Sequence, residues 1–283
     1  MKCSLIVINY NDAVRVGRAI EACLNQTHKD IEVIVVDDGS NEETRKEYVR
    51  FGDKIKMIQL ERTDEHERNP SRPRNAGIKV ATGEFMAVLD SDNFYSPEFV
   101  EEMVKGIEDV AFCNWEIFGL QKYTAEIEKK WEFKHSVMTN YLMHTHLDHQ
   151  CLLMRTELVR EVGCYDERLA RSQDCDLLIR LMLATNKWMH VPKVLFHFER
   201  HEEDQMKTIA SAYGKMLWFL KNNINIAILL QGYVRGDYNL ALSMYKAMED
   251  FKTLDIWKED FEKSEYKKQL GIHKGMLDKE WHE

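Results

Sequence analysis

The amino-acid sequence predicts an α/β protein in which helices flank a mostly parallel central sheet, followed by a C-terminal helical extension. Over the first 110 residues, short apolar runs alternate with segments of helical periodicity, as in parallel strands buried on both faces. Polar clusters follow several of these runs, at the carboxyl ends where such sheets bind ligands. We therefore expect one domain with halves at 1–110 and 111–202, and a helical extension at 203–283.

The individual elements follow from the residue pattern in chain order. Apolar runs predict strands at 4–8, 31–36, 55–60, 85–89, 110–118, 151–154 and 188–198. Helical spacing and start signals predict helices near 16–24, after Ser40 or Asn41 as cap, at 74–81, from Pro97, at 157–162, and at 173–184 after the cap Ser172. Residues 119–150 are expected to be irregular.

Composition narrows the class of protein. The net charge of −9 argues against nucleic acid as the main partner, because such binding needs clustered Lys and Arg. The longest apolar stretch, 224–234, is too short to span a bilayer, so we expect no transmembrane segment. No signal peptide is recognisable, and the six cysteines are scattered without a C-x-x-C pair. These features predict a cytoplasmic protein with reduced thiols.

The most informative motif is the acidic pair that ends the run at 84–92. In an extended chain alternate side chains share a face, so Asp90 and Asp92 can point at the same ligand. Two carboxylates at the end of a strand suit a hard divalent cation that also holds substrate phosphates. An acidic turn without a ligand is the alternative for this motif in isolation.

Two other clusters fit the same edge of the sheet. Asp37 and Asp38 open a turn whose carboxylates and main chain could bind a base and a ribose, or simply cap the next helix. Arg72 and Arg74 put positive charge at a helix start, which suits a diphosphate, or a solvated surface pair.

A third carboxylate is a candidate general base. Asp174 falls in the first turn of the helix at 173–184, where the helix dipole favours its ionised form. Such a carboxylate can take a proton from an acceptor hydroxyl, although helix capping would also explain it. Asp176 is expected to pair with Arg180 at i,i+4.

Histidines form the remaining polar group. His144, His146 and His149 surround Asp148, but their spacing matches no standard zinc pattern, so we favour acceptor contacts or a structural role over a metal site. His201 follows the last strand and could reach back as a metal or phosphate ligand. In the tail, an apolar stripe at 213–224 indicates packing within the chain or in a homo-oligomer.

Taken in order, these motifs resemble the inverting family 2 glycosyltransferases of GT-A fold. No glycine-rich dinucleotide loop, P-loop or nucleophile elbow competes with this reading. The segments that carry the resemblance are Ser4 to Asn11, Val36 to Ser40, Arg74 to Gly77, Ala81 to Phe85, Leu89 to Asn93, Val162 to Glu167 and Gln173 to Leu177. It covers about residues 3–202 and implies a Rossmann-like, mostly parallel sheet.

The resemblance also implies roles for individual residues. Asp174 would be the catalytic base, and Asp92, Asp90 and His201 would hold Mn²⁺ or Mg²⁺. The implied nucleotide-binding residues are Ile8, Asn9, Tyr10, Asp37, Asp38, Arg74, Asp90 and Ser91. Those implied for the acceptor or sugar are His149, Gln173 and Asp148.

The sequence thus predicts a metal-dependent transfer from a nucleotide-diphosphate sugar, with UDP favoured, to a hydroxyl of a glycan, lipid-linked or protein acceptor. The family usually has Glu where Gln173 precedes the base, which keeps a non-catalytic nucleotide-sugar-binding protein open as the alternative. A nucleotidyltransferase is disfavoured, because the loop at 9–15 lacks the glycine- and Lys/Arg-rich character that it would need.

Overall fold

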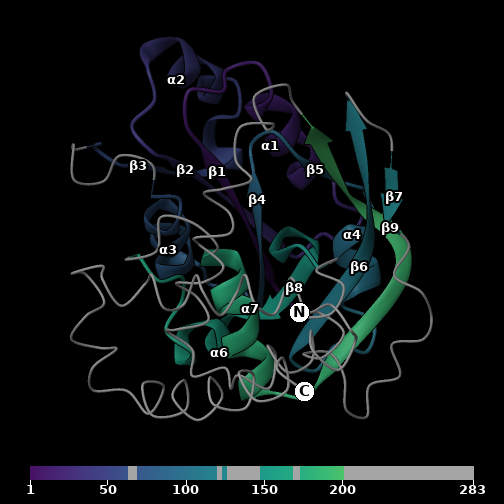
Figure 1. The fold of residues 1–283 in the computed structure, drawn as a ribbon. Helices are drawn as coiled ribbons and strands as arrows, with labels where there is room; N and C mark the ends of the chain where they lie inside the picture. The colour runs from purple at the N-terminus through teal and green to yellow at the C-terminus, as the bar shows by residue number, and fades with distance from the viewer. Residues whose placement is uncertain (63–68, 120–122, 126–146, 168–172, 201–283) are drawn as a thin grey trace, which may run out of the picture. The chain divides into compact units, whose positions relative to one another are not determined.

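The computed structural model describes residues 1–62, 69–119, 123–125, 147–167 and 173–200 (Figure 1). The strands are β1 (Cys3–Asn9), β2 (Ile31–Asp37), β3 (Lys56–Gln59), β4 (Phe85–Asp90), β5 (Phe94–Tyr95), β6 (Val110–Gly119), β7 (Tyr123–Ala125), β8 (Leu152–Arg155) and β9 (Trp188–Arg200). The α-helices are α1 (Val16–Leu24), α2 (Glu42–Val49), α3 (Ser71–Val80), α4 (Phe99–Met103), α6 (Thr156–Glu161) and α7 (Gln173–Ala184). Two short 3₁₀ helices are η1 (Gly52–Lys54) and η3 (His149–Cys151). The predicted extension at 203–283 lies outside the described residues.

The strands form one mixed sheet in the order β3-β2-β1-β4-β8-β6-β9-β5, with β7 paired to β6. Strands β3, β2, β1 and β4 are parallel to one another, as the continuous apolar runs predict. Strand β8 is antiparallel to both β4 and β6, whereas β6 and β9 are parallel. The predicted α/β class with a mostly parallel sheet and flanking helices is therefore confirmed.

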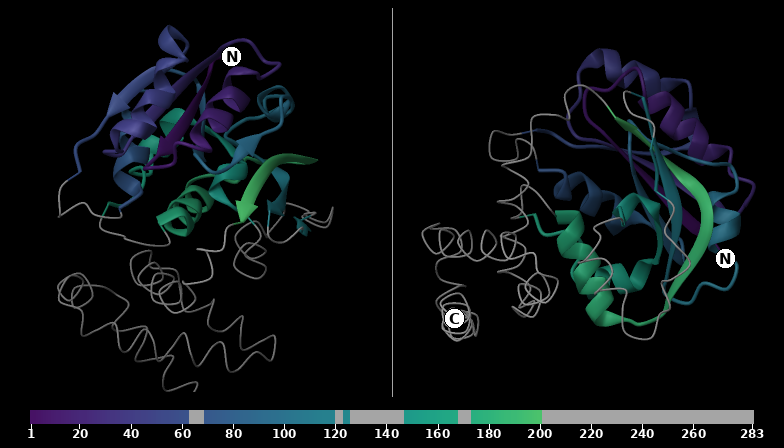
Figure 2. Two further views of the ribbon diagram at one scale, coloured as in Figure 1. Left: turned by 90° about the horizontal axis from the view of Figure 1, so that it is seen from above. Right: turned by 45° about the vertical axis from the view of Figure 1, so that its right-hand side comes forward.

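Helices cover both faces of this sheet, with α3, α6 and α7 on one face and α1 and α4 on the other (Figure 2). The central strands β1 and β4 are buried along nearly their whole length, so the core lies on both sides of them. Within the described ranges, no helix is long and apolar enough to cross a membrane.

Most predicted boundaries agree with the structure within two residues, but the helix predicted at 74–81 begins three residues earlier, at Ser71. Two of the smaller differences have a clear reason. The helix predicted from Pro97 begins at Phe99, because the Pro97 carbonyl accepts a hydrogen bond from Thr27 N at 2.8 Å instead of an intrahelical one. Cys151 ends η3 rather than beginning a strand, since its N–H bonds to the Asp148 carbonyl at 3.1 Å. The predicted cap Asn41 is confirmed by its bond from Thr44 N at 2.9 Å.

At the amino ends of the central strands, one carboxylate ties β2 to β1 and to the turn before β4. Glu32 Oε1 accepts hydrogen bonds from Ser4 Oγ at 2.6 Å and Thr82 N at 2.6 Å. Burial opposes the charge, but the hydrogen bonds from Ser4 and Thr82 outweigh it and lower the pKa of Glu32 to about 2.

We expect Glu32→Gln to lower the free energy of unfolding by about 1–2 kcal/mol at pH 7. Because the folded-state pKa is depressed, this stabilisation is present above the ordinary pKa of Glu and is lost as pH falls from about 4.5 towards about 2. Urea unfolding of both proteins at pH 7 and pH 3 tests this. A stability difference that does not shrink at pH 3 would contradict it.

Candidate active site

Loops at the carboxyl ends of β1, β2 and β4 bond to one another and form one edge of the candidate site. Ser91 N donates to the Ile8 carbonyl at 3.0 Å, and Asp38 N donates to the Asn9 carbonyl at 2.9 Å. The structure thus brings together four of the predicted nucleotide-binding residues, from three strands that the sequence separates.

Asp37 has a different environment from its neighbour. Its side chain is fully buried, and its carboxylate accepts bonds from Ser40 N at 3.2 Å and Tyr48 Oη at 3.2 Å. Arg45 Nε lies 3.3 Å from the other oxygen. The carboxylate therefore anchors α2 to β2, and the direct nucleotide contact of Asp37 stays a prediction.

Asp38, at the carboxyl end of β2, pairs with two arginines. Arg62 Nε is 3.3 Å and Arg72 Nη1 3.8 Å from its carboxylate oxygens, although burial still raises the pKa of Asp38 above its ordinary value. The Arg62 guanidinium also stacks over the Tyr10 ring, 3.4 Å from its centroid. An aromatic face and a carboxylate side by side are suited to a planar base that stacks and donates hydrogen bonds.

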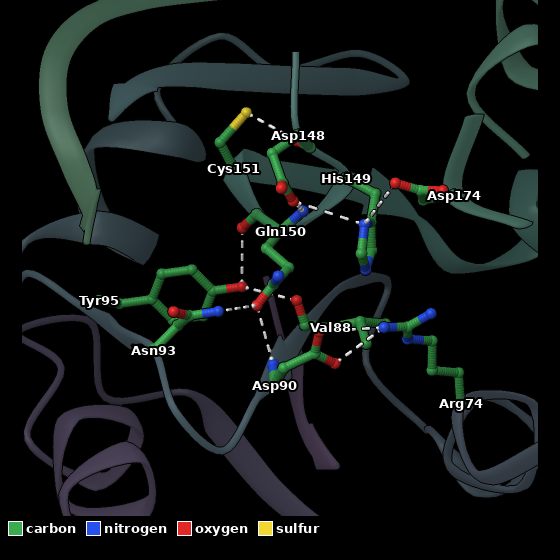
Figure 3. Close-up of polar contacts among 10 residues, drawn as sticks. All are labelled: Arg74, Val88, Asp90, Asn93, Tyr95, Asp148, His149, Gln150, Cys151 and Asp174. Atoms are coloured by element: carbon green, nitrogen blue, oxygen red, sulfur yellow. Dashed lines mark hydrogen bonds and ion pairs between the residues drawn. The ribbon is translucent and has the colours of Figure 1, made fainter. Parts of the chain in front are cut away.

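An ion pair between Arg74 and Asp90 joins α3 to the end of β4. Arg74 Nη2 donates to both Asp90 oxygens, at 2.9 and 3.0 Å, and this guanidinium outweighs burial to lower the pKa of Asp90 (Figure 3). Helix α3 can approach β1 this closely because of Gly77, where a Cβ would lie 2.3 Å from Ile6 Cγ2. Within the described residues, Arg74 Nε and Nη1 have no hydrogen-bond partner although they are buried.

Asp92 follows two residues later and is held through its main chain. Arg18 Nη2 donates to the Asp92 carbonyl at 2.5 Å and pairs with Glu199 at the end of β9. The Arg18 guanidinium packs over the Phe94 ring, 5.0 Å from its centroid. Burial and the like charge of Asp90 raise the pKa of Asp92 to about 7, so the pair repel each other without a cation.

The buried side-chain amide of Gln150 connects residues 90–93, which we call the acidic loop, to the opposite side of the site (Figure 3). Gln150 Oε1, in η3, accepts from Asp90 N at 2.9 Å and Asn93 Nδ2 at 3.0 Å. Gln150 is fixed in turn, because its N–H bonds to Asp148 Oδ1 at 2.8 Å and its carbonyl accepts from Tyr95 Oη at 2.9 Å. The acidic loop and η3 are therefore one connected unit.

We expect Gln150→Met, which keeps the side-chain length but removes the acceptor, to leave the N–H groups of Asp90 and Asn93 unpaired. Such losses cost about 1–3 kcal/mol, so the melting temperature should fall and Mn²⁺-dependent UDP binding should weaken about tenfold. Calorimetry and thermal unfolding measure both effects. Gln150→Glu retains an acceptor and should recover part of the stability, whereas wild-type binding by Gln150→Met would contradict the expectation.

His149 and Asp174 meet beside this unit. His149 Nδ1 lies 3.4 Å from Asp148 Oδ1 and 3.9 Å from Asp174 Oδ2, and neither ring nitrogen has a hydrogen-bond partner within the described residues (Figure 3). The Asp174 side chain is 34% exposed, so its carboxylate can be reached from solvent. Gln173 is buried, and its Oε1 has no hydrogen-bond partner in the part of the chain that the structure describes. The structure thus brings all three predicted acceptor residues next to the predicted base.

The second carboxylate of α7 has the structural role that its spacing predicts. Asp176 is fully buried and pairs with Arg180 Nη2 at 2.5 Å, at i,i+4. This confirmed pair separates the roles of the two carboxylates of the helix: Asp176 fixes its first turn, and Asp174 remains accessible.

Several predicted residues cannot be placed. His144, His146, His201 and Ser172 lie outside the described residues. The acceptor or structural role of the first two histidines, the late metal ligand and the helix cap therefore stay predictions. Within the described ranges, no group of three His, Cys, Asp or Glu side chains could hold a metal ion by itself. Two carboxylates completed by substrate phosphates remain a normal arrangement for Mg²⁺.

The sequence reasoning missed four residues that shape the site, namely Arg18, Asn93, Gln150 and Tyr165. Asn93 directly follows the acidic motif, and Tyr165 lies in one of the segments that carry the resemblance, so both had a local signal. Arg18 and Gln150 had none, because their partners are 74 and 57–60 residues away in sequence.

Comparison with known families identifies the fold and the chemistry. Residues 4–163, more than half of the chain, match the model of glycosyl transferase family 2. The chain belongs to this family. It is a glycosyltransferase of GT-A fold.

Proteins of similar sequence are also described as glycosyltransferases. An uncharacterized glycosyltransferase of Rickettsia typhi is 26% identical over 274 residues, which cover 85% of this chain and 84% of the relative. One from Methanocaldococcus jannaschii is 29% identical and covers 71% of each chain.

Solved structures share the fold. The TarS structure from S. aureus in complex with UDP-GlcNAc superposes with a TM-score of 0.63 at 20% identity, over 94% of this chain and 74% of that one. The mannosyltransferase PcManGT from Pyrobaculum calidifontis, in complex with GDP-Man and Mn²⁺, gives 0.54 at 14% identity, over 88% and 72%.

Proposed function

We propose that this family 2 glycosyltransferase is metal-dependent and inverting, and that it moves a sugar from a UDP-sugar to an acceptor hydroxyl in glycan or glycoconjugate synthesis. The observation that carries the proposal is the convergence of the accessible Asp174 carboxylate with the Arg74–Asp90 pair at the carboxyl edge of the sheet. Asp174 is suited to removing a proton. The Arg74 guanidinium, which holds Asp90 of the acidic loop, is suited to binding a diphosphate.

The residues at the acidic loop fit a divalent cation. Asp90 and Asp92 supply hard carboxylate oxygens, and burial together with the like charge of Asp90 raises the pKa of Asp92, an effect that a cation would relieve. When bound by Asp92 and Asp90, Mn²⁺ or Mg²⁺ would neutralise charge on the departing diphosphate. Arg18 and Gln150 would keep these carboxylates in position through main-chain bonds.

Asp174 would act as general base. It takes the proton of the acceptor hydroxyl while that oxygen attacks the anomeric carbon from the face opposite the nucleotide. The bond between the anomeric carbon and the phosphate oxygen breaks, so the nucleoside diphosphate leaves with the electron pair. Holding donor and acceptor in line contributes further, since orientation alone can lower a barrier by several kcal/mol.

Two observations support UDP as the nucleotide: the ligands of proteins with the same fold, and the side chains around Asp38. The relative TarS was solved with UDP and with UDP-GlcNAc, whereas the relative PcManGT was solved with GDP-Man. Asp38 and the exposed Tyr10 ring offer a carboxylate and a stacking face of the size of a pyrimidine.

The test is release of nucleotide from a panel of UDP-, GDP- and dTDP-sugars by the purified protein, with Mn²⁺ and with EDTA. We expect Mn²⁺-dependent release from a UDP-sugar. Calorimetric binding of a UDP-sugar without release, with or without glycan acceptors, would favour the non-catalytic binding protein. Absence of both release and binding across the panel would overturn the proposal.

A further inference from the structure

Tyr165 combines complete burial with an unsatisfied hydroxyl. Its side chain is 2% exposed, and its Oη has no hydrogen-bond partner within the described residues. Buried tyrosine hydroxyls usually find a partner, because leaving one unpaired costs free energy. A ligand that completes the site would supply that partner.

The position of the Tyr165 ring is fixed by its own main chain. Tyr165 N donates to Asn75 Oδ1 at 2.9 Å, and its carbonyl accepts from Asn75 Nδ2 at 2.8 Å. Ser71 Oγ bonds to the next carbonyl, that of Asp166, at 3.1 Å. Helix α3 thus holds the main chain of the turn after α6, which fixes the point from which the Tyr165 side chain extends.

The ring lies between the two functional groups of the site. The Arg74 guanidinium packs over it at 5.4 Å, and the His149 ring meets it edge-on at 5.8 Å. Arg74 also bonds Asp90 of the acidic loop, and His149 lies beside Asp174. In the proposed reaction the sugar moves from a diphosphate on the first side to an acceptor oxygen on the second, so the transferred sugar must lie between them.

Unpartnered polar atoms gather at the same place. Buried atoms without a hydrogen-bond partner within the described residues include those of Arg74, His149 and Tyr165, whose side chains pack together, and that of Gln173, which precedes Asp174. They include both donors and acceptors, which suits a ligand whose own groups both donate and accept. Sugar hydroxyls do this, whereas a phosphate would leave the Gln173 oxygen unpaired.

We propose that Tyr165 is a specificity-determining residue whose hydroxyl hydrogen-bonds a hydroxyl of the transferred sugar, beside Arg74. This inference rests on the proposed function, since it assigns the sugar of the donor to this place. Burial raises the pKa of Tyr165 well above neutrality, so the phenol stays protonated and can both donate and accept.

Tyr165→Phe tests the inference, because it removes one oxygen and keeps the ring. Calorimetry in Mn²⁺ first identifies a nucleotide sugar that the wild type binds. The affinities of the wild type and the variant are then measured for this nucleotide sugar and for the matching nucleoside diphosphate. The variant should bind the nucleotide sugar about tenfold more weakly, equivalent to about 1.4 kcal/mol, and the diphosphate unchanged. Its melting temperature should stay equal or rise, because an unpaired buried group is lost.

Tyr95→Phe is the matched control for stability. Tyr95 is equally buried, but its hydroxyl donates to the carbonyls of Val88 and Gln150 at 3.0 and 2.9 Å, so its loss should lower the melting temperature. If Tyr165→Phe binds both ligands like the wild type, or weakens both equally, the inference is overturned. If the wild type binds no nucleotide sugar, the proposed function itself fails, which is a separate result.

Discussion

Replacement of Asp174 by Asn should reduce donor turnover by about 10²–10⁴-fold, the usual contribution of a general base, while donor affinity changes less than about twofold. The amide has the size of the carboxylate but cannot take up a proton. Asp174 is accessible, and within the described residues its carboxylate makes no ion pair closer than the 3.9 Å between Oδ2 and His149 Nδ1, so the substitution should disturb the fold little. Nucleotide release and calorimetric donor binding measure the two quantities.

Asp176→Asn provides a control from the same helix turn. It weakens the buried pair with Arg180, so it should lower the melting temperature yet keep turnover in the folded protein. The opposite pattern is expected for Asp174→Asn, with stability kept and turnover lost. Wild-type turnover by Asp174→Asn, or equal losses in both variants at a temperature where both are folded, would remove Asp174 as the base.

The donor half of the site could be predicted from sequence because its signals are local. Each parallel strand is a continuous apolar run, and its polar residues follow at once, so strand ends and candidate ligands are found together. The acidic pair directly follows such a run, although Asp90 ends β4 and Asp92 lies in the turn after it, so the strand alternation assumed for the pair does not extend to Asp92. The i,i+4 pair of Asp176 and Arg180 is local in the same sense.

The connections between the halves could not be predicted, since they depend on pairs far apart in the chain. The Gln150 amide meets Asn93 only because β8 lies antiparallel between β4 and β6, and no residue pattern shows that order. The role of Asp37 also depends on tertiary contacts: next to Asp38 it has the same sequence signal, but Tyr48 and Arg45 bind its carboxylate. The two-residue strand β5 is too short for periodicity to reveal.

Replacement of Asp92 by Asn should abolish most of the metal dependence of donor binding. Loss of a residue that merely supports a metal ligand typically costs 10–100-fold in affinity, so loss of the ligand itself should weaken Mn²⁺ binding by at least about 100-fold. Without metal the substitution removes the repulsion from Asp90, so the variant should unfold at a temperature no lower than that of the wild type.

Thermal unfolding with and without Mn²⁺ and UDP distinguishes these effects. Ligands raise the melting temperature in proportion to the logarithm of their concentration over Kd, so the wild type should be stabilised and Asp92→Asn hardly at all. Asp53→Asn, an exposed carboxylate of η1, should respond like the wild type. Equal stabilisation of Asp92→Asn and the wild type by Mn²⁺ and UDP would mean that the cation is held elsewhere. Loss of the response to UDP alone, in EDTA, would instead assign Asp92 to the nucleotide, because no metal takes part in that binding.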